Sequence, residues 1–178
     1  MKHAELAHVL RAAAGITNLK RFLVLGSKAV LGSVSENQAL RLGEAFHLSV
    51  EVDIVPLDRP DLKELIDGSI GEGSPFQAEF GYYADGVDVR VATLPDGWED
   101  RLVPFDAGEG VTGLCLEIHD LLASKLEAGR SKDESFILDV LALDGADRDT
   151  LDRRIDLLPV ADERKRILHE RVEAFLSA

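Results

Sequence analysis

The sequence has almost no cysteine and no long apolar run, and each shortage narrows the class of protein. Cys115 is the single cysteine among 178 residues, so no disulfide can form within the chain. No apolar stretch approaches the roughly 18 residues that a membrane helix needs. The N-terminal sequence does not resemble a signal peptide, because it has an acid at Glu5 and no long apolar segment after it. We therefore expect one domain over residues 1–178, located in the reducing cytoplasm and not bound to a membrane.

Positive charge is also scarce. The chain has 33 acidic and 20 basic residues, a net charge of −13. Nucleic acids are bound chiefly through Lys and Arg side chains that neutralise phosphates, so any such contact would need a local basic patch. Two candidate patches exist: Lys125, Arg130 and Lys132 in the middle of the chain, and Arg164, Lys165, Arg166 and Arg171 near its end. Zinc is not expected, because the five histidines lack paired ligand spacing.

Hydrophobic periodicity divides the chain into a mixed first part and a helical second part. The expected helices lie at 4–14, 37–46, 116–126, 150–157 and 162–176, with a short one opening at 60 and another around 136–141. The expected strands lie at 21–25 and 48–55, with a hairpin of 76–83 and 87–94 turning at 84–86 and an extended piece at 98–105. The glycine-rich segment 68–75 is expected to be a loop. The predicted fold class is α/β (α+β), a small mixed sheet over about 20–105 with a helical portion over about 114–178.

Two acids stand on the predicted strand 48–55. Glu51 and Asp53 are two residues apart, so both side chains point to the same face of the strand. Neighbouring carboxylates repel unless a cation or hydrogen bonds offset their charge, and Mg²⁺ prefers oxygen ligands of this kind. A strand with a polar outer face would show the same alternation, so this interpretation stays open beside the metal site.

Gly26 and Ser27 follow the apolar strand 21–25. A glycine at this place lets the backbone approach a ligand phosphate, and the serine hydroxyl can bond to a phosphate or cap a helix. The dipeptide is also common in ordinary turns.

The order of these motifs is similar to the signature of the nucleotidyltransferase superfamily. Leu25-Gly26-Ser27 is followed by Glu51-Val52-Asp53-Ile54, and residues 118–133 resemble the Asp-Leu…Lys…Ala-x-Arg-x-Lys-Asp stretch of nucleotidyltransferase-like proteins related to abortive-infection toxins. Shorter motifs resemble one uncharacterised bacterial family of that group: Ser74-Pro75-Phe76, Phe80-Gly81-Tyr82-Tyr83 and Leu94-Pro95-Asp96-Gly97-Trp98. The resemblance covers roughly residues 20–145.

The resemblance implies roles for single residues. Gly26 and Ser27 would hold nucleotide phosphates, and Glu51 and Asp53 would bind Mg²⁺ and carry the catalysis. Lys125 would face the triphosphate. Further support for nucleotide or acceptor binding would come from Arg130, Lys132 and Asp133. The third catalytic carboxylate of the superfamily would be Asp88, with Glu79 as the alternative.

The implied function is Mg²⁺-dependent transfer of a nucleotide from a nucleoside triphosphate to an RNA or protein hydroxyl, in a toxin–antitoxin or phage-defence setting that could include a partner protein. The first acid is Glu51, where the superfamily usually has Asp. This departure keeps a second hypothesis open, in which a degenerate fold binds a nucleotide or a protein without catalysis. A third is an unrelated α/β domain with a chance match. The first hypothesis requires Glu51 and Asp53 to lie beside Ser27.

Overall fold

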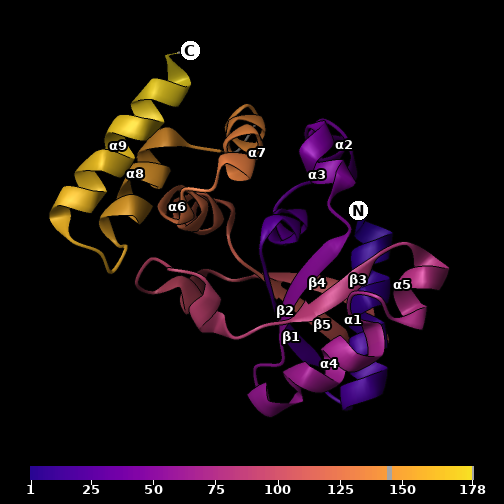
Figure 1. The fold of residues 1–178 in the computed structure, drawn as a ribbon. Helices are drawn as coiled ribbons and strands as arrows, with labels where there is room; N and C mark the ends of the chain where they lie inside the picture. Colours follow the sequence, from indigo (N-terminus) through magenta and orange to yellow (C-terminus); the bar gives the residue numbers. More distant parts are fainter. Residues whose placement is uncertain (144–145, 178) are drawn as a thin grey trace.

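The computed structural model describes residues 1–143 and 146–177, and of Ala45 and Lys132 it describes the backbone only (Figure 1). Its centre is a five-stranded sheet in the order β3-β2-β1-β5-β4. Strand β1 runs antiparallel to β2 and parallel to β5, and β2 runs parallel to β3. The strands are β1 (Arg21–Leu25), β2 (Glu51–Val55), β3 (Tyr83–Gly86), β4 (Val103–Gly108) and β5 (Val111–Cys115). A mixed sheet flanked by helices confirms the predicted fold class.

Strand β1 is the centre of the core because its sequence is apolar on both faces. Four consecutive residues, Phe22 to Leu25, are each at most 2% exposed. Such a continuous apolar run is typical of a strand covered on both sides. Helix α1 (His3–Thr17) provides part of the cover, since a Cβ atom placed on Gly113 of β5 would lie 2.8 Å from Leu10 Cδ1.

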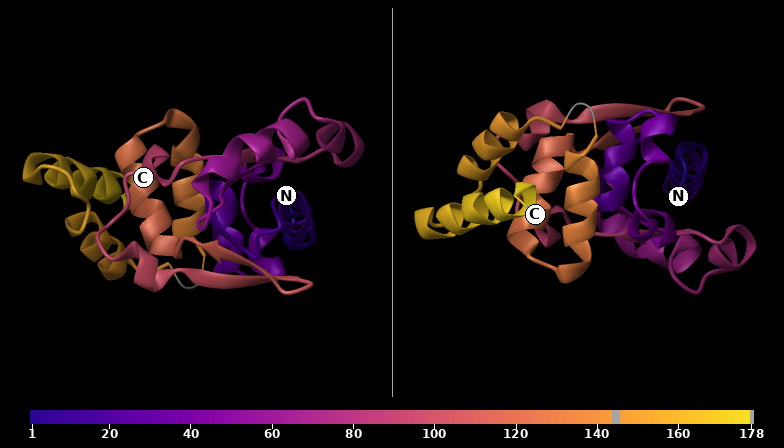
Figure 2. Two further views of the ribbon diagram at one scale, coloured as in Figure 1. Left: turned by 90° about the horizontal axis from the view of Figure 1, so that it is seen from below. Right: turned by 90° about the horizontal axis from the view of Figure 1, so that it is seen from above.

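Helices gather on two sides of the sheet (Figures 1 and 2). On one side lie α1, α4 and α5; on the other lie α6 to α9, which form the helical second part of the chain. The remaining α-helices are α2 (Glu36–Ala39), α3 (Glu44–Leu48), α4 (Lys63–Ile70), α5 (Pro75–Phe80), α6 (Ile118–Ala128), α7 (Ser131–Leu141), α8 (Arg148–Asp156) and α9 (Asp162–Leu176). The short 3-10 helices are η1 (Ser27–Gly32), η2 (Pro60–Leu62), η3 (Val89–Val91) and η4 (Trp98–Arg101). Helices were expected where α1, α6, α7, α8 and α9 lie, and these predictions are confirmed.

The predicted hairpin of 76–83 and 87–94 is wrong. Residues 75–80 form helix α5, because Ser74 accepts a hydrogen bond from the Gln77 backbone N–H at 3.2 Å and Pro75 occupies the first helical position. The segment predicted to be the turn is strand β3, which pairs with β2 in parallel. A parallel pair needs a long crossover, and residues 56–82 supply it with helices.

Three further boundaries differ from the prediction. Helix α4 runs through Gly68 to Ile70, into the expected loop. Strand β2 begins at Glu51, because Leu48 ends helix α3 and residues 49–50 connect the two elements. Strand β5, over residues expected to be helical or unassigned, extends the sheet past the predicted limit of 105. It pairs with β1 on one edge and with β4 on the other.

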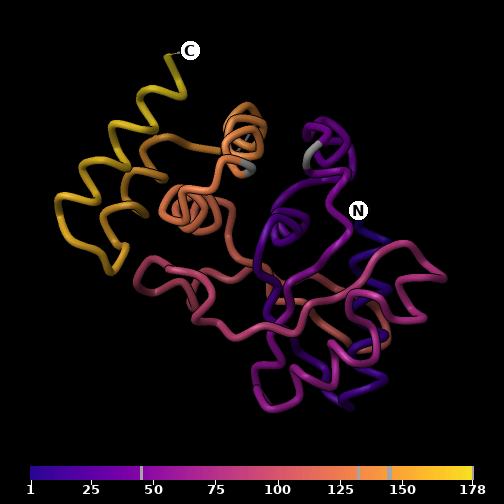
Figure 3. Tube along the Cα trace, viewed as in Figure 1, coloured from indigo at the N-terminus to yellow at the C-terminus, as the bar shows by residue number. Residues whose placement is uncertain are grey.

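The segment between β3 and β4 connects the two parts of the molecule. It leaves the sheet and runs beside the C-terminal helices, as the tube in Figure 3 shows. The Asp96 backbone N–H donates to the Leu157 carbonyl at 2.8 Å. Residues 98–101, expected to be extended, form η4 instead. The two parts of the chain are therefore joined by packing and hydrogen bonds as well as by sequence.

Candidate functional site

The turn after β1 lies directly against the second acid of β2. Leu25 pairs with Asp53 in the antiparallel register. Gly26 has φ 60° and ψ −167°, a conformation essentially restricted to glycine. A Cβ atom at this position would lie 2.0 Å from Asp53 Oδ2. The turn therefore needs glycine both for its backbone angles and for the carboxylate beside it.

The expected site residues gather around two adjoining clefts that share five lining residues. The smaller cleft, of about 50 Å³, lies at the end of β1 and β2. Its lining residues are Gly26, Ser27, Ser49, Glu51, Asp53, Lys125, Arg130 and Asp133. Residues from two distant parts of the sequence thus meet at one place, and the geometry required by the first hypothesis is present.

The larger cleft has a volume of about 400 Å³ and a more apolar wall. It extends from Gly26 and Asp53 towards η3 and α6. Its apolar lining comes from Leu25, Val87, Val91, Ala92, Leu116, Leu121 and Ala128. This cleft is large enough for part of an organic ligand whose charged end reaches the smaller cleft.

A third carboxylate stands next to the pair on β2. In the parallel register Asp85 of β3 is the partner of Asp53, and Tyr83 is the partner of Glu51. Burial, followed by the negative charges of Asp53 and Glu51, raises the pKa of Asp85 from 3.8 to about 6. Like charges brought this close resist joint ionisation, so the group would gain from a cation.

Tyr83 touches the same group of acids. Its hydroxyl donates a hydrogen bond to Glu51 Oε2 at 3.3 Å. Burial is the main cause that raises the pKa of Tyr83 to about 12, and the neighbouring charges of Asp85 and Glu51 add to it. Tyr83 therefore stays protonated and acts as a donor that orients Glu51.

Asp88, the expected third acid, lies in different surroundings. Its carboxylate caps η3 and forms a two-point ion pair with Arg90, with both side-chain contacts at 2.8 Å. This pairing lowers the pKa of Asp88. Neither Asp88 nor Asp85 lines either cleft, but Asp85 is the strand partner of Asp53 whereas Asp88 is paired with Arg90. The alternative, Glu79, is exposed on α5. The sequence missed Asp85 because Ala84-Asp85-Gly86 has the composition of a turn.

The basic residues of the expected site differ in how they are held. Lys125 Nζ donates to Asp133 Oδ1 at 2.5 Å and lies 4.8 Å from the ring centroid of Phe136. Arg130 is exposed, and among the described residues its side chain has no hydrogen-bond or ion-pair partner. The side chain of Lys132 lies outside the described part of the structure. Lys125 is thus fixed in place, whereas Arg130 is available to a ligand.

A buried lysine next to this site was not singled out from the sequence. Lys28 follows Ser27 in η1 and is 1% exposed. Its ammonium donates to the Phe46 carbonyl at 2.5 Å and lies 3.8 Å from the Phe46 ring centroid. Burial lowers the pKa of Lys28 to about 8, while the charge of Glu51 acts in the opposite direction. The ammonium places a positive charge behind the carboxylates of β2.

The donor set fits a magnesium ion that is bound together with a phosphate ligand. Within the described residues, no three His, Cys, Asp or Glu side chains converge into a preformed metal site. Mg²⁺ usually takes one or two carboxylates, keeps several waters and binds substrate phosphates. Glu51 and Asp53, with Asp85 alongside, supply carboxylates of that kind on neighbouring strands.

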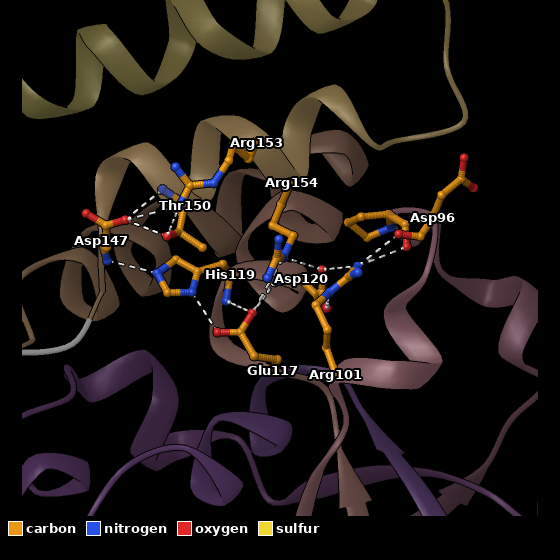
Figure 4. Close-up of polar contacts among 10 residues, drawn as sticks. Asp96, Arg101, Glu117, His119, Asp120, Asp147, Thr150, Arg153 and Arg154 are labelled. Carbon is orange, nitrogen blue, oxygen red and sulfur yellow. Dashed lines mark hydrogen bonds and ion pairs between the residues drawn. The ribbon is translucent and has the colours of Figure 1, made fainter.

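A second charged group holds the surrounding framework together (Figure 4). Asp120 of α6 is fully buried and accepts two hydrogen bonds from Arg101 of η4, at 2.8 and 2.9 Å. Arg154 of α8 adds an ion pair, with Nε 3.1 Å from Asp120 Oδ1. His119 bonds to Glu117 at 2.6 Å and accepts from the Asp147 backbone N–H at 2.8 Å. These contacts join η4, α6 and α8.

The sequence over residues 4–173 matches the family described as "Nucleotidyltransferase of unknown function (DUF6036)". The chain belongs to this family. The resemblance to the nucleotidyltransferase superfamily is thereby confirmed, and the chain is assigned a general nucleotidyltransferase role. The link to the abortive-infection branch stays a prediction. No match was found among curated proteins or solved structures.

Two further findings on this nucleotidyltransferase-family chain concern membrane-spanning helices and the substrate. Within residues 1–143 and 146–177, no helix has the length and apolar character needed to cross a bilayer. The family also indicates a nucleotide as the substrate, which agrees with the position of the two clefts.

Proposed function

We propose that the protein is a Mg²⁺-dependent enzyme that transfers a nucleotide from a nucleoside triphosphate to a hydroxyl group of RNA or protein. One observation carries the proposal: Glu51 and Asp53 share a cleft with Ser27, Lys125 and Arg130. Carboxylates for a cation and basic groups for phosphates therefore lie within a single site. The cytoplasmic location and the toxin–antitoxin or phage-defence setting, with a partner protein, belong to the same proposal.

The carboxylates would hold the magnesium. We assign Glu51 and Asp53 to the ion, and we assign the third carboxylate to Asp85 in place of Asp88, because Asp85 is the strand partner of Asp53. When bound, Mg²⁺ would neutralise phosphate charge and align the triphosphate. One of the carboxylates of β2 would accept the proton of the acceptor hydroxyl.

The remaining residues would bind the nucleotide. Gly26 lets the turn lie against the Asp53 carboxylate at the wall of the smaller cleft, and the hydroxyl of Ser27 would bond to a phosphate in that cleft. Lys125, held by Asp133, would offset charge that develops on the phosphates. Arg130 would contact the triphosphate from the rim, and the larger cleft would receive the nucleoside. Lys132 keeps its expected role in nucleotide binding as a prediction.

Calorimetric titration with the four nucleoside triphosphates, with and without Mg²⁺, tests this proposal. We expect metal-dependent binding that Asp53→Asn abolishes. The matched control is Asp58→Asn, which makes the same change of charge at an exposed residue outside both clefts. Pyrophosphate release with a cell extract as acceptor source then measures turnover.

A nucleotide- or protein-binding module without catalysis is the second candidate. The observation that favours it is the lack of a converged three-residue metal cluster in the described part of the chain. Triphosphate binding that ignores Mg²⁺ and survives Asp53→Asn would support the module and reject the enzyme.

A further inference from the structure

The basic residues of the C-terminal helices are occupied by acids or carbonyls of the same chain. This part of the sequence contains one of the two candidate basic patches. The five contacts are Arg164 with Glu127 at 2.6 Å, Lys165 with the Asp156 carbonyl at 2.7 Å, Arg166 with Glu163 at 2.5 Å and with Glu170 at 2.9 Å, and Arg171 with Glu134 at 2.8 Å. Positive charge that is matched within the protein adds little to the attraction of a polyanion.

In the candidate basic patch at the site, pairing within the chain also removes free positive charge. Lys125 is paired with Asp133, so Arg130 is the cation of the two clefts that has no partner among the described residues. The same clefts are lined by Glu51, Asp53, Glu127 and Asp133. A bound triphosphate would engage Arg130. Of the acids, Glu127 and Asp133 are paired within the chain, and Glu51 and Asp53 are assigned to Mg²⁺. An acceptor that approaches this site would then meet no free cation among the described residues of the clefts.

We propose that the acceptor hydroxyl is carried by a positively charged segment of a protein and not by RNA. This inference rests on the proposed function and specifies its acceptor. An RNA acceptor brings a phosphate with each nucleotide and is held chiefly by Lys and Arg contacts, whereas Arg130 is the one unpaired cation among the described residues of the clefts. A chain of net charge −13 attracts a basic partner and repels RNA.

The reaction balances with the triphosphate as the single co-substrate. The acceptor oxygen forms a bond to the α-phosphorus, and the bond from that phosphorus to the oxygen bridging to the β-phosphate breaks. Pyrophosphate leaves with the electron pair of that bond. The proton of the acceptor hydroxyl passes to a carboxylate of β2, and no oxidant or reductant is involved.

The experiment compares three acceptors, each incubated with the protein, Mg²⁺ and triphosphates radiolabelled in the α-phosphate. The first is a synthetic peptide in which Lys alternates with Ser, Thr and Tyr. The second peptide is identical except that Glu replaces every Lys. The third acceptor is total transfer RNA. We expect at least about tenfold more label on the Lys peptide than on either other acceptor at low salt. This difference should shrink at about 1 M salt, where charges are screened over about 3 Å.

Two results would overturn the inference while the proposed function stands. One is label on transfer RNA equal to or above that on the Lys peptide. The other is equal labelling of the two peptides, which includes the case in which no acceptor is labelled, while calorimetry still measures Mg²⁺-dependent triphosphate binding. Failure of the proposed function itself is recognised separately, because triphosphate binding would then be absent or insensitive to Asp53→Asn.

Discussion

The carboxylates of β2 and β3 and the buried ion network of α6 show opposite ways of placing charge inside one protein. In the network, Asp120 is fully buried, and two arginines neutralise it from η4 and α8. On the strands, Asp85 stands beside Asp53 and Glu51, and its pKa rises to about 6. The first arrangement is complete without a ligand, whereas the second concentrates negative charge next to a cleft.

This difference distinguishes the structural role of the network from the functional role that we propose for the acids. Burying a charge is costly, so a buried charge that contributes to architecture comes with its partners. Acids of like sign that gather at an open cleft destabilise one another, and such an arrangement is typical of a site that binds a cation. The predictions below challenge this contrast, in order of decreasing effect.

Asp120→Asn should cause the largest loss of stability. The change keeps the shape of the side chain but leaves Arg101 without its negative partner and Arg154 with Glu117 alone, at 3.9 Å, and breaking a buried pair costs about 3–5 kcal/mol. Urea unfolding followed by circular dichroism measures the effect. The control is Glu170→Ala, which removes an exposed partner of Arg166 and should leave stability nearly unchanged. Equal midpoints for the two variants would contradict a structural role for the network.

Gly26→Ala should reduce stability less but abolish nucleotide binding. The backbone conformation would cost about 1–3 kcal/mol for alanine, and the new methyl group would push Asp53 out of its position. Gly110→Ala is the matched control, because Gly110 also has positive φ, 73°, but has open space around its Cβ position. Unchanged triphosphate affinity in Gly26→Ala would refute the contact between the turn and the second acid.

Asp85→Asn should change how stability depends on pH. The pKa of Asp85 is about 6 in the folded chain and 3.8 when unperturbed. Between these values the unfolded chain loses its proton first, so this group makes the free energy of unfolding fall as pH rises from about 4 to 6. The variant lacks this contribution. The free energy of unfolding of the variant, minus that of the unmodified protein, should therefore increase across that range, and urea titrations at each pH measure this difference. A constant difference would place Asp85 outside the group of acids.

Asp88→Asn should have the smallest effect. Asp88 is paired with Arg90, whereas Asp85 is the strand partner of Asp53, so we expect Mg²⁺-dependent triphosphate binding by Asp88→Asn to stay within about twofold of the unmodified protein, a difference of less than about 0.5 kcal/mol. Asp85→Asn should weaken the same binding much more. The reverse order, measured by calorimetry, would return the third carboxylate to Asp88.

Much of the fold could be predicted from local patterns. The run Phe22 to Leu25 predicts a buried strand, and the helices after residue 116 follow from periodic apolar positions. The hairpin prediction was wrong because Ser74 and Pro75 start a helix, so the apolar residues that follow lie in that helix and not in a strand. Strand β5 was not predicted, because it forms by pairing with two short strands, and the residues of β5 alone do not indicate those partners.

The sequence by itself determined the acid pair of β2 and the glycine turn, because side-chain alternation and glycine's backbone freedom are local properties. Only the tertiary structure decided which third acid joins them. That choice depends on the parallel register of β3, which places Asp85 beside Asp53 while Asp88 turns to Arg90. Tertiary structure also decided which cations are available. Pairing between residues far apart in the chain occupies Arg164 and Arg171 and leaves Arg130 at the cleft.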